Sequence, residues 1–377
     1  MNRLFLSFLL ALPLAACGDS DFKPLASGRP GEVLVIADST TWNGPVGEAI
    51  RAEIGQPSRT LPQPEPAFDL VHQTLNDYYL DSVRRQTAVI FAAPYTDTTA
   101  TARFLRARLD SAGVAALEQG GRGVILRPDL WARDQLVVYA TAPSDSALAA
   151  QIRAQGGQVR DALNALARER LEDDMFEKAR QVDVEEELLE EHGFTFNVQH
   201  DYLLVRDTTF QTATGDRGTF VRLRRVLTDT WRDVFVYYED DPEIERLQPD
   251  SVLALRERLT ERFVLGTSDS VFVQVEDRFP ERAPIVVDTV SLGGRFALET
   301  RGLWYLGDAE GRTAGIGGPF VNYAFYDEDT GRFYMIDGMV YAPDYPKREF
   351  LRQVETIAHT FRTAPPEFEV VADREES

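Results

Sequence analysis

One side chain has a position that suggests covalent modification. Cys17 is the only cysteine in the chain of 377 residues, so it has no disulfide partner and no second thiolate with which to hold a metal. It follows an apolar run from Leu4 to Leu14 and two alanines, which together have the length and the small-residue end of a secretory signal peptide. We therefore expect residues 1–16 to be a signal peptide that is cleaved before Cys17.

The segment that ends in Cys17 resembles the lipobox of bacterial lipoproteins, and this resemblance implies that the thiol carries a diacylglycerol. Each buried methylene of the acyl chains stabilises membrane attachment by about 0.8 kcal/mol. The alternative is an ordinary secretory signal with a cysteine there by chance. No later stretch reaches the roughly 18 apolar residues of a membrane span. We expect a body tethered by residues 17–30 to the cell envelope, at the outer rather than the inner membrane, on its periplasmic or outer face.

Carboxylates offer a second kind of chemistry. Glu65 and Asp69 could serve as acid and base of a hydrolase if the fold brought another carboxylate close to them. Both lie in residues 61–70 (LPQPEPAFDL), where the prolines force an extended, non-helical passage. The same loop is a candidate binding surface through Gln63, Glu65 and Phe68, or else a rigid crossing over the first domain.

The sequence predicts no metal and no cofactor. Gly315–Pro319 lacks an amide donor at Pro319 and precedes a predicted strand, so we expect a turn instead of a phosphate cradle. Asp327–Gly331 has the alternating acids of a calcium loop, but Met339 stands where the bidentate glutamate is needed, which favours a hairpin turn. The four histidines show no metal-ligand spacing and are expected to be structural: His72, His192, His200 and His359.

The charge balance argues against nucleic acid as a partner. The formal net charge of −21 becomes −22 when residues 1–16 are removed, because Arg3 is their only charged side chain. Phosphate backbones require clustered cations, whereas the strongest charge runs in this chain are acidic. A solvated acidic surface is the expected consequence.

The first half predicts an α/β-type layered domain over residues 31–155. Strands and helices alternate there, as expected for a sheet covered by helices. The predicted strands are 32–38, 68–73, 87–92, 123–126 and 135–141, and the predicted helices are 44–54, 99–109 and one that Ser144 caps. Residues 156–192 are predicted to form a helical linker, either one long helix or a broken pair.

The second half predicts a mainly antiparallel sheet packed by helices over residues 193–364, so the fold class is α+β. Its apolar residues alternate with a period of two. The predicted strands are 202–207, 218–225, 231–238, 270–275, 295–306, 320–326 and 332–341, and the predicted helices are 250–263 and one that begins at Pro346. Residues 365–377 form an acidic tail.

Large aromatic side chains are a further set of candidate surface residues. Trp304, Tyr323 and Phe325 belong to neighbouring predicted strands, and both faces of the hairpin carry aromatic rings. One face must pack on helices. The other could pack on the first domain or expose a binding surface, to which Trp131 of the first half would add.

Three runs in the first half are similar to uncharacterised lipoproteins of Bacteroidota that share a domain of unknown function: residues 28–32 (GRPGE), residues 61–66 with Phe68, and residues 129–135 (DLWARDQ). The resemblance extends over about residues 28–362 and implies no activity. The second half resembles the PsbP/Mog1-type α+β sandwich in residues 192–196, the hairpin at 327–332 and the closing helix that ends at 359–362. Domains of that type mostly bind partners.

These patterns favour a noncatalytic binding or assembly module whose partner is another envelope protein. A carboxylate-dependent hydrolase is the rival hypothesis, and it would require two carboxylates facing each other across a concave pocket. A carrier of an apolar ligand is the third, and it would require a sizeable closed cavity between sheet and helices.

Overall fold

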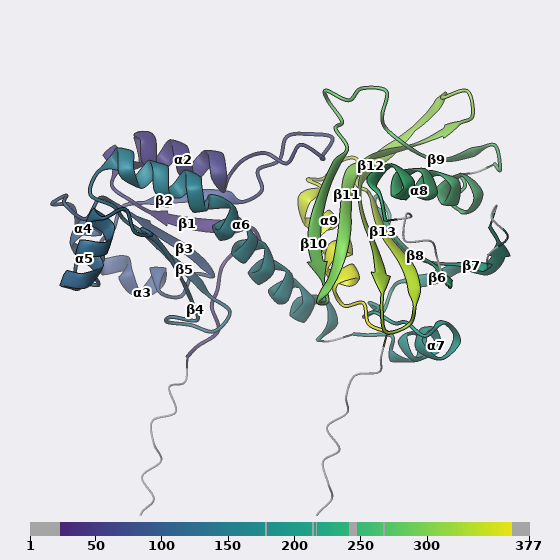
Figure 1. The fold of residues 1–377 in the computed structure, drawn as a ribbon, viewed down its shortest axis with the longest axis horizontal. Helices are drawn as coiled ribbons and strands as arrows, with labels where there is room; N and C mark the ends of the chain where they lie inside the picture. Colours follow the sequence, from purple (N-terminus) through teal and green to yellow (C-terminus); the bar gives the residue numbers. More distant parts are fainter. Residues whose placement is uncertain are drawn as a thin grey trace, which may run out of the picture.

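The computed structural model describes residues 23–363 apart from 178, 213–214, 216, 241–246 and 267, and apart from the side chain of Asp77. Cys17, the predicted signal peptide and the predicted acidic tail lie outside the described residues. The described chain mixes helices and strands in two bodies, each built on its own sheet, which confirms the α+β class (Figure 1). None of its helices is long and apolar enough to cross a membrane.

The first body is built on a mostly parallel sheet with the strand order β2-β1-β3-β5-β4 in the described chain. Only β4 runs antiparallel, beside β5. All five residues of β3 are buried, because helices cover both faces of a parallel sheet and its strands are therefore nearly continuous apolar runs. The strands are β1 (Glu32–Ile36), β2 (Asp69–Gln73), β3 (Ala88–Ala92), β4 (Val124–Pro128) and β5 (Leu136–Ala140).

Helices cover both faces of this sheet. One core places α2 and α6 against β1, β3 and β5, and a second core places α3 and α4 on the opposite face. Gly156 lets α6 approach α2 closely, since a Cβ at this position would lie 2.4 Å from the Cβ of Glu53. The helices are α1 (Ser39–Asn43), α2 (Pro45–Glu53), η1 (Asp77–Tyr79), α3 (Leu80–Val83), α4 (Ala100–Arg106), α5 (Ser111–Glu118) and α6 (Asp145–Phe176).

The first described residues are docked onto this body. Leu25 forms a parallel bridge with Arg133, and Ser27 forms one with Gln86. The amide of Ala26 donates to the carbonyl of Arg133 at 2.9 Å. Residues 23–27 are thus held by backbone hydrogen bonds to the β4–β5 turn and to the segment before β3, although the sequence predicts a free tether over residues 17–30.

Helix α6 joins the two bodies. It begins after Ser144, whose side chain accepts a hydrogen bond from the amide of Ala147, and it runs from the first sheet to the second (Figure 1). Its 32 residues span about 48 Å. Met175 and Phe176 at its end belong to the core of the second body. The predicted linker, residues 156–192, therefore consists of α6 from residue 156 to its end and of α7 (Val182–His192). Both helices are packed into the cores of the two bodies.

The second body is an antiparallel sheet with the described strand order β10-β11-β12-β13-β8-β7-β6, to which β9 is added beside β11. Helix α8 covers one face, and α9 with α7 covers the other. The elements are β6 (Leu203–Gln211), β7 (Arg217–Val226), β8 (Trp231–Asp240), α8 (Pro249–Phe263), β9 (Val271–Val275), β10 (Val286–Leu292), β11 (Arg295–Asp308), β12 (Thr313–Asp327), β13 (Arg332–Tyr341) and α9 (Arg348–His359).

The glycine-rich run before Phe320 is part of a strand and not the turn that the sequence predicts. β12 begins at Thr313 and includes Gly315–Pro319. A Cβ at Gly318 would lie 2.0 Å from the carbonyl oxygen of Val340. Gly317 and Gly318 therefore allow backbones to approach closely within a sheet, which is a recognised use of glycine in strands.

Candidate functional site

Three of the predicted surface aromatics lie in the cores of the second body. Trp304 and Tyr323 are 1% exposed and Phe325 is fully buried. Tyr323 and Phe325 pack on the α9 side of the sheet, whereas Trp304 packs on the α8 side and donates its indole N–H to the carbonyl of Pro319 at 3.1 Å. They form no exposed surface. The two faces of the second sheet are covered by helices of the second body, one face by α9 and the other by α8. The face opposite α9 therefore packs on α8 and not on the first body.

The candidates in the first body have three different environments. Trp131 is half-buried and meets Phe91 edge-on at 6.0 Å between ring centroids. Gln63 is exposed. Phe68 is 2% exposed and lies under the guanidinium of Arg352, whose carbon is 4.8 Å from the ring centroid. Of these three, Phe68 is the residue that takes part in the contact between the two bodies.

Glu65 caps a helix of the other body. Its Oε1 accepts a hydrogen bond from the amide of Lys347 at 2.7 Å, and its Oε2 accepts one from the amide of Arg348 at 2.9 Å. These amides stand at the start of α9, where the first backbone N–H groups have no intrahelical acceptor and the helix dipole favours a negative charge. Both carboxylate oxygens therefore have a structural use, in place of the acid–base role that the sequence allows.

Two arginines of α9 bind residues 66–69, at the end of the proline-spaced loop. Arg348 donates to the carbonyl of Pro66 at 2.7 Å and forms an ion pair with Asp69 at 2.7 Å. Arg352 donates to the carbonyl of Ala67 at 2.7 Å. Burial lowers the pKa of Arg352, whereas the hydrogen bonds of Arg348 with carboxylates outweigh burial and raise its pKa. Asp69, the second candidate for acid–base chemistry, is thus paired with a cation.

Gly31 makes the second contact with α9. It has φ +72°, in the left-handed region, and a Cβ here would lie 2.8–2.9 Å from side-chain atoms of Arg348, Arg352 and Glu349. Only glycine satisfies both the backbone conformation and the close approach. The runs at residues 28–32 and 61–68, which carry the family resemblance, therefore form much of the interface between the bodies.

A cavity of about 120 Å³ lies at this interface, at the amino ends of β1 and β3. Apolar side chains such as Val33, Phe68 and Leu163 form part of its wall. Charged side chains line it as well: Arg29, Glu32, Arg170, Asp174 and Glu349. Pockets for drug-sized ligands measure roughly 300–1,000 Å³, so this cleft accommodates one ring-sized group with polar atoms beside it.

A half-buried ion-pair cluster connects β11 with α9. Arg301 of β11 donates two hydrogen bonds to Glu299, at 2.6 and 2.9 Å, and pairs with Glu355 of α9. Burial lowers the pKa of Arg301, but the two carboxylates outweigh it and raise the pKa well above its usual value. Burial, with the same carboxylates, raises the pKa of Tyr323. The hydroxyl of the candidate Tyr323 is therefore neutral, and its side chain is a buried structural neighbour of these ion pairs.

His359 closes the cluster at the end of α9. Its ring meets Tyr323 edge-on at 5.6 Å between centroids. Burial, then the positive charge of Arg168 on α6, and then that of Arg301 lower its pKa from 6.5 to about 4, while Glu299 opposes them. The imidazole is therefore neutral at pH 7.

The fold and the cleft define a two-domain protein in which an α/β domain and an antiparallel α+β domain are joined by the long helix α6. The loop of residues 65–67 in the first domain binds the start of α9 in the second, and we call this contact the clamp on α9. Residues 26–176 match a domain of unknown function, DUF8532, and residues 181–360 match a second domain of unknown function, DUF4837. No curated protein matches the chain. The border between the two matches follows the end of α6.

The sequence reasoning missed the cationic half of the interface. Arg348 and Arg352 contact residues about 280 positions earlier in the chain. One signal was present, because Pro30-Gly31 before a strand indicates a turn that requires glycine. Nothing in the sequence near α9 names its partner.

Proposed function

We propose that this chain is a lipid-anchored protein of the cell envelope, without catalytic activity, whose interdomain cleft receives a side chain of a partner protein. The observation that carries the proposal is the cavity of about 120 Å³ to which both domains contribute. Clefts between domains are common places for binding sites. The hydrogen bonds between the first domain and the start of α9 would hold the two sides of this cleft in a fixed relative position.

The geometry favours binding over hydrolysis. The two oxygens of Glu65 accept amides of α9, and Asp69 pairs with Arg348. Three other carboxylates line the cavity, but none of them is buried as the acid of a glycosidase-like pair would be, and Glu349 is paired with Arg348 and Arg352: Glu32, Asp174 and Glu349. An apolar cargo fits poorly as well. The cavity is small, and Arg29, Glu32 and Arg170 place charges on its lining.

The expected occupant is a single aromatic or branched apolar side chain on a segment of another envelope protein. An apolar cavity of about 150 Å³ holds one benzene ring, which is close to the space available here. The charged residues beside the cavity would pair with polar groups of the partner's backbone and flanking side chains. Interfaces of this kind depend on one anchoring side chain in a pocket surrounded by polar contacts.

Photo-crosslinking in native envelopes tests this proposal. A photoreactive amino acid at Ala167 of α6 would face the cleft, whereas one at the exposed Ala165 on the same helix would not. We expect one partner to be captured from position 167 and not from position 165. The substitution Leu166→Trp, which narrows the cleft, should reduce that capture. Equal capture from both positions, or capture that Leu166→Trp does not change, would contradict the proposal.

The anchor itself is tested at Cys17. The lipobox-like segment supports lipid attachment there. The resemblance that the sequence suggests to lipoproteins of Bacteroidota would agree with this anchor, and the one to PsbP/Mog1-type domains would agree with a binding role. We expect the wild-type chain to sediment with membranes after a high-salt wash and Cys17→Ala to be released. Retention of Cys17→Ala in the washed membranes would rule out this anchor.

A further inference from the structure

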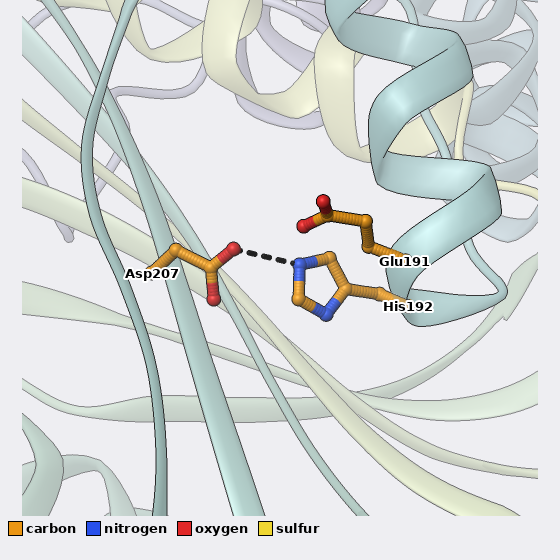
Figure 2. Close-up of side chains that lie close together, drawn as sticks. All are labelled: Glu191, His192 and Asp207. Carbon is orange, nitrogen blue, oxygen red and sulfur yellow. Dashed lines mark hydrogen bonds and ion pairs between the residues drawn. The ribbon is translucent and has the colours of Figure 1, made fainter.

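Three side chains with metal-ligand chemistry converge far from the interdomain cleft. Glu191 and His192 stand at the C-terminal end of α7, and Asp207 stands on β6, the strand at the edge of the second sheet (Figure 2). Their ligand atoms all lie within 4.8 Å of one another. The Nε2 of His192 is 2.9 Å from Oδ2 of Asp207. The set combines one imidazole nitrogen with two carboxylates.

The ring of His192 is held in the orientation that a metal ligand needs. Its Nδ1 lies 3.2 Å from the hydroxyl of Tyr238, and the ring stacks on Phe194 at 5.7 Å between centroids. Metal-binding histidines usually have a hydrogen-bond acceptor at the second ring nitrogen, and this partner fixes the tautomer. Without a metal, Nε2 donates its proton to Asp207 at 2.9 Å. A metal ion would take the place of that proton, and Nδ1 would then donate to the hydroxyl of Tyr238.

The site is accessible and its electrostatics favour a cation. Glu191 and Asp207 are exposed, whereas His192 is only 8% exposed. The carbonyl end of a helix carries partial negative charge, and here two carboxylates add to it. One positive charge lies at the same helix end, because Arg332 donates to the carbonyl of His192. Its charge opposes that of a bound cation, but it is offset by the ion pair with Asp240 at 2.7 Å.

We propose that Glu191, His192 and Asp207 bind a divalent transition-metal ion, of which Zn²⁺ is the best fit. Imidazole with carboxylate suits zinc and its neighbours, whereas calcium and magnesium prefer ligand sets made of oxygen alone. Water would fill the remaining coordination positions. The ion would replace the direct contact between His192 and Asp207 and tie the end of α7 to the edge strand.

Calorimetry on the full chain, purified in detergent and freed of metal with a chelator, tests the proposal with Zn²⁺ alone. We expect one Zn²⁺ per chain. Glu191→Gln and Asp207→Asn should each weaken binding by at least the roughly 10-fold to 100-fold that loss of a supporting contact causes. Tyr238→Phe should weaken it by about tenfold for the same reason. The visible spectrum of bound Co²⁺ reports directly whether nitrogen and oxygen ligands surround the ion.

Two matched controls separate this site from adventitious binding. Glu190→Gln removes the same charge from the neighbouring exposed glutamate, and His200→Gln removes an exposed histidine. Both should bind Zn²⁺ as the wild type does. Circular dichroism checks that each variant is folded, and the exposed position of Glu191 makes Glu191→Gln the safest of them. Absence of one-to-one binding, or equal binding by Glu191→Gln and Glu190→Gln, would overturn the proposal.

Discussion

The two domains bury different kinds of side chain. In the described part of the first domain, every buried polar side chain is uncharged: Thr41, Thr60, Thr101, Gln135 and Thr141. The second domain buries many ionisable side chains: Glu185, His192, Arg222, Arg232, Asp233, Glu239, Arg256, Asp327, Asp337, Lys347, Arg352 and Glu355. The stability of the first core therefore depends on apolar packing, whereas that of the second core depends on charge pairing as well.

The pair between α8 and β13 shows what this difference means. Arg256 donates to Asp337 at 2.6 Å, both side chains are fully buried, and the amide of Asn322 adds a hydrogen bond to Asp337 at 3.0 Å. The guanidinium also lies 3.7 Å from the ring centroid of Phe320. Burial raises the pKa of Asp337, and Arg256 opposes that effect. Such a pair adds little over apolar packing, but the loss of one partner leaves a buried charge without compensation.

Asp337→Ala should have the largest effect. We expect the free energy of unfolding to fall by about 3–5 kcal/mol, because Arg256 would remain buried without its counter-charge. Urea unfolding followed by tryptophan fluorescence measures it, since Trp231 and Trp304 report on the second domain.

The apolar core of the first domain supplies the contrast. Ile90→Val there should cost only about 0.5–1.5 kcal/mol. The double variant Arg256→Met with Asp337→Leu should be more stable than Asp337→Ala alone. If Asp337→Ala cost no more than Ile90→Val, charge pairing would not distinguish the two cores.

The pH dependence of stability is the second test, through His359. The unfolded chain binds a proton on this ring below pH 6.5, whereas the folded chain binds it only near pH 4. Stability should therefore decrease as the pH falls from 6.5 to 4, by up to about 3 kcal/mol from this group. Urea unfolding at several pH values should show a shallower slope in His359→Gln than in the wild type. His200→Gln, at an exposed histidine, should keep the wild-type slope.

The smallest effect is expected at the junction between the domains. Glu65→Ala removes the acceptor at the start of α9 and should lower the free energy of unfolding by about 0.5–2 kcal/mol, as the loss of a helix cap does. Gln63→Ala in the same loop is the control, because this side chain is exposed and should change stability little. Chemical unfolding of the two variants, measured side by side, checks this. Equal stability of both would mean that the clamp on α9 does not need the carboxylate.

Local sequence patterns placed most elements correctly. The apolar run at residues 87–92 became β3, and Ser144 caps α6 as predicted. Strand β10 was not predicted, because it packs few of its residues inside and its alternation in Val286–Leu292 is correspondingly weak. These outcomes depend on neighbours within a few residues, which is the range over which periodicity and capping act.

The interface was out of reach for the same reason. Glu65 accepts hydrogen bonds from backbone amides that lie 282 and 283 residues away. Because nearly every residue has a backbone amide, the sequence does not indicate which amides a side chain will bind. The convergence of His192 with Asp207 likewise requires a helix end to meet a neighbouring strand across 15 residues. Spacing alone identifies ligands that share one element, not ligands that tertiary packing brings together.

The docking of residues 23–27 sets how far the protein can stand from a membrane. If Cys17 carries the lipid, only residues 18–22 separate it from Lys23, whose ammonium donates to the carbonyl of Asp129. Even a fully extended chain of this length spans no more than roughly 20 Å. The β4–β5 turn of the first domain would then stay close to the lipid headgroups.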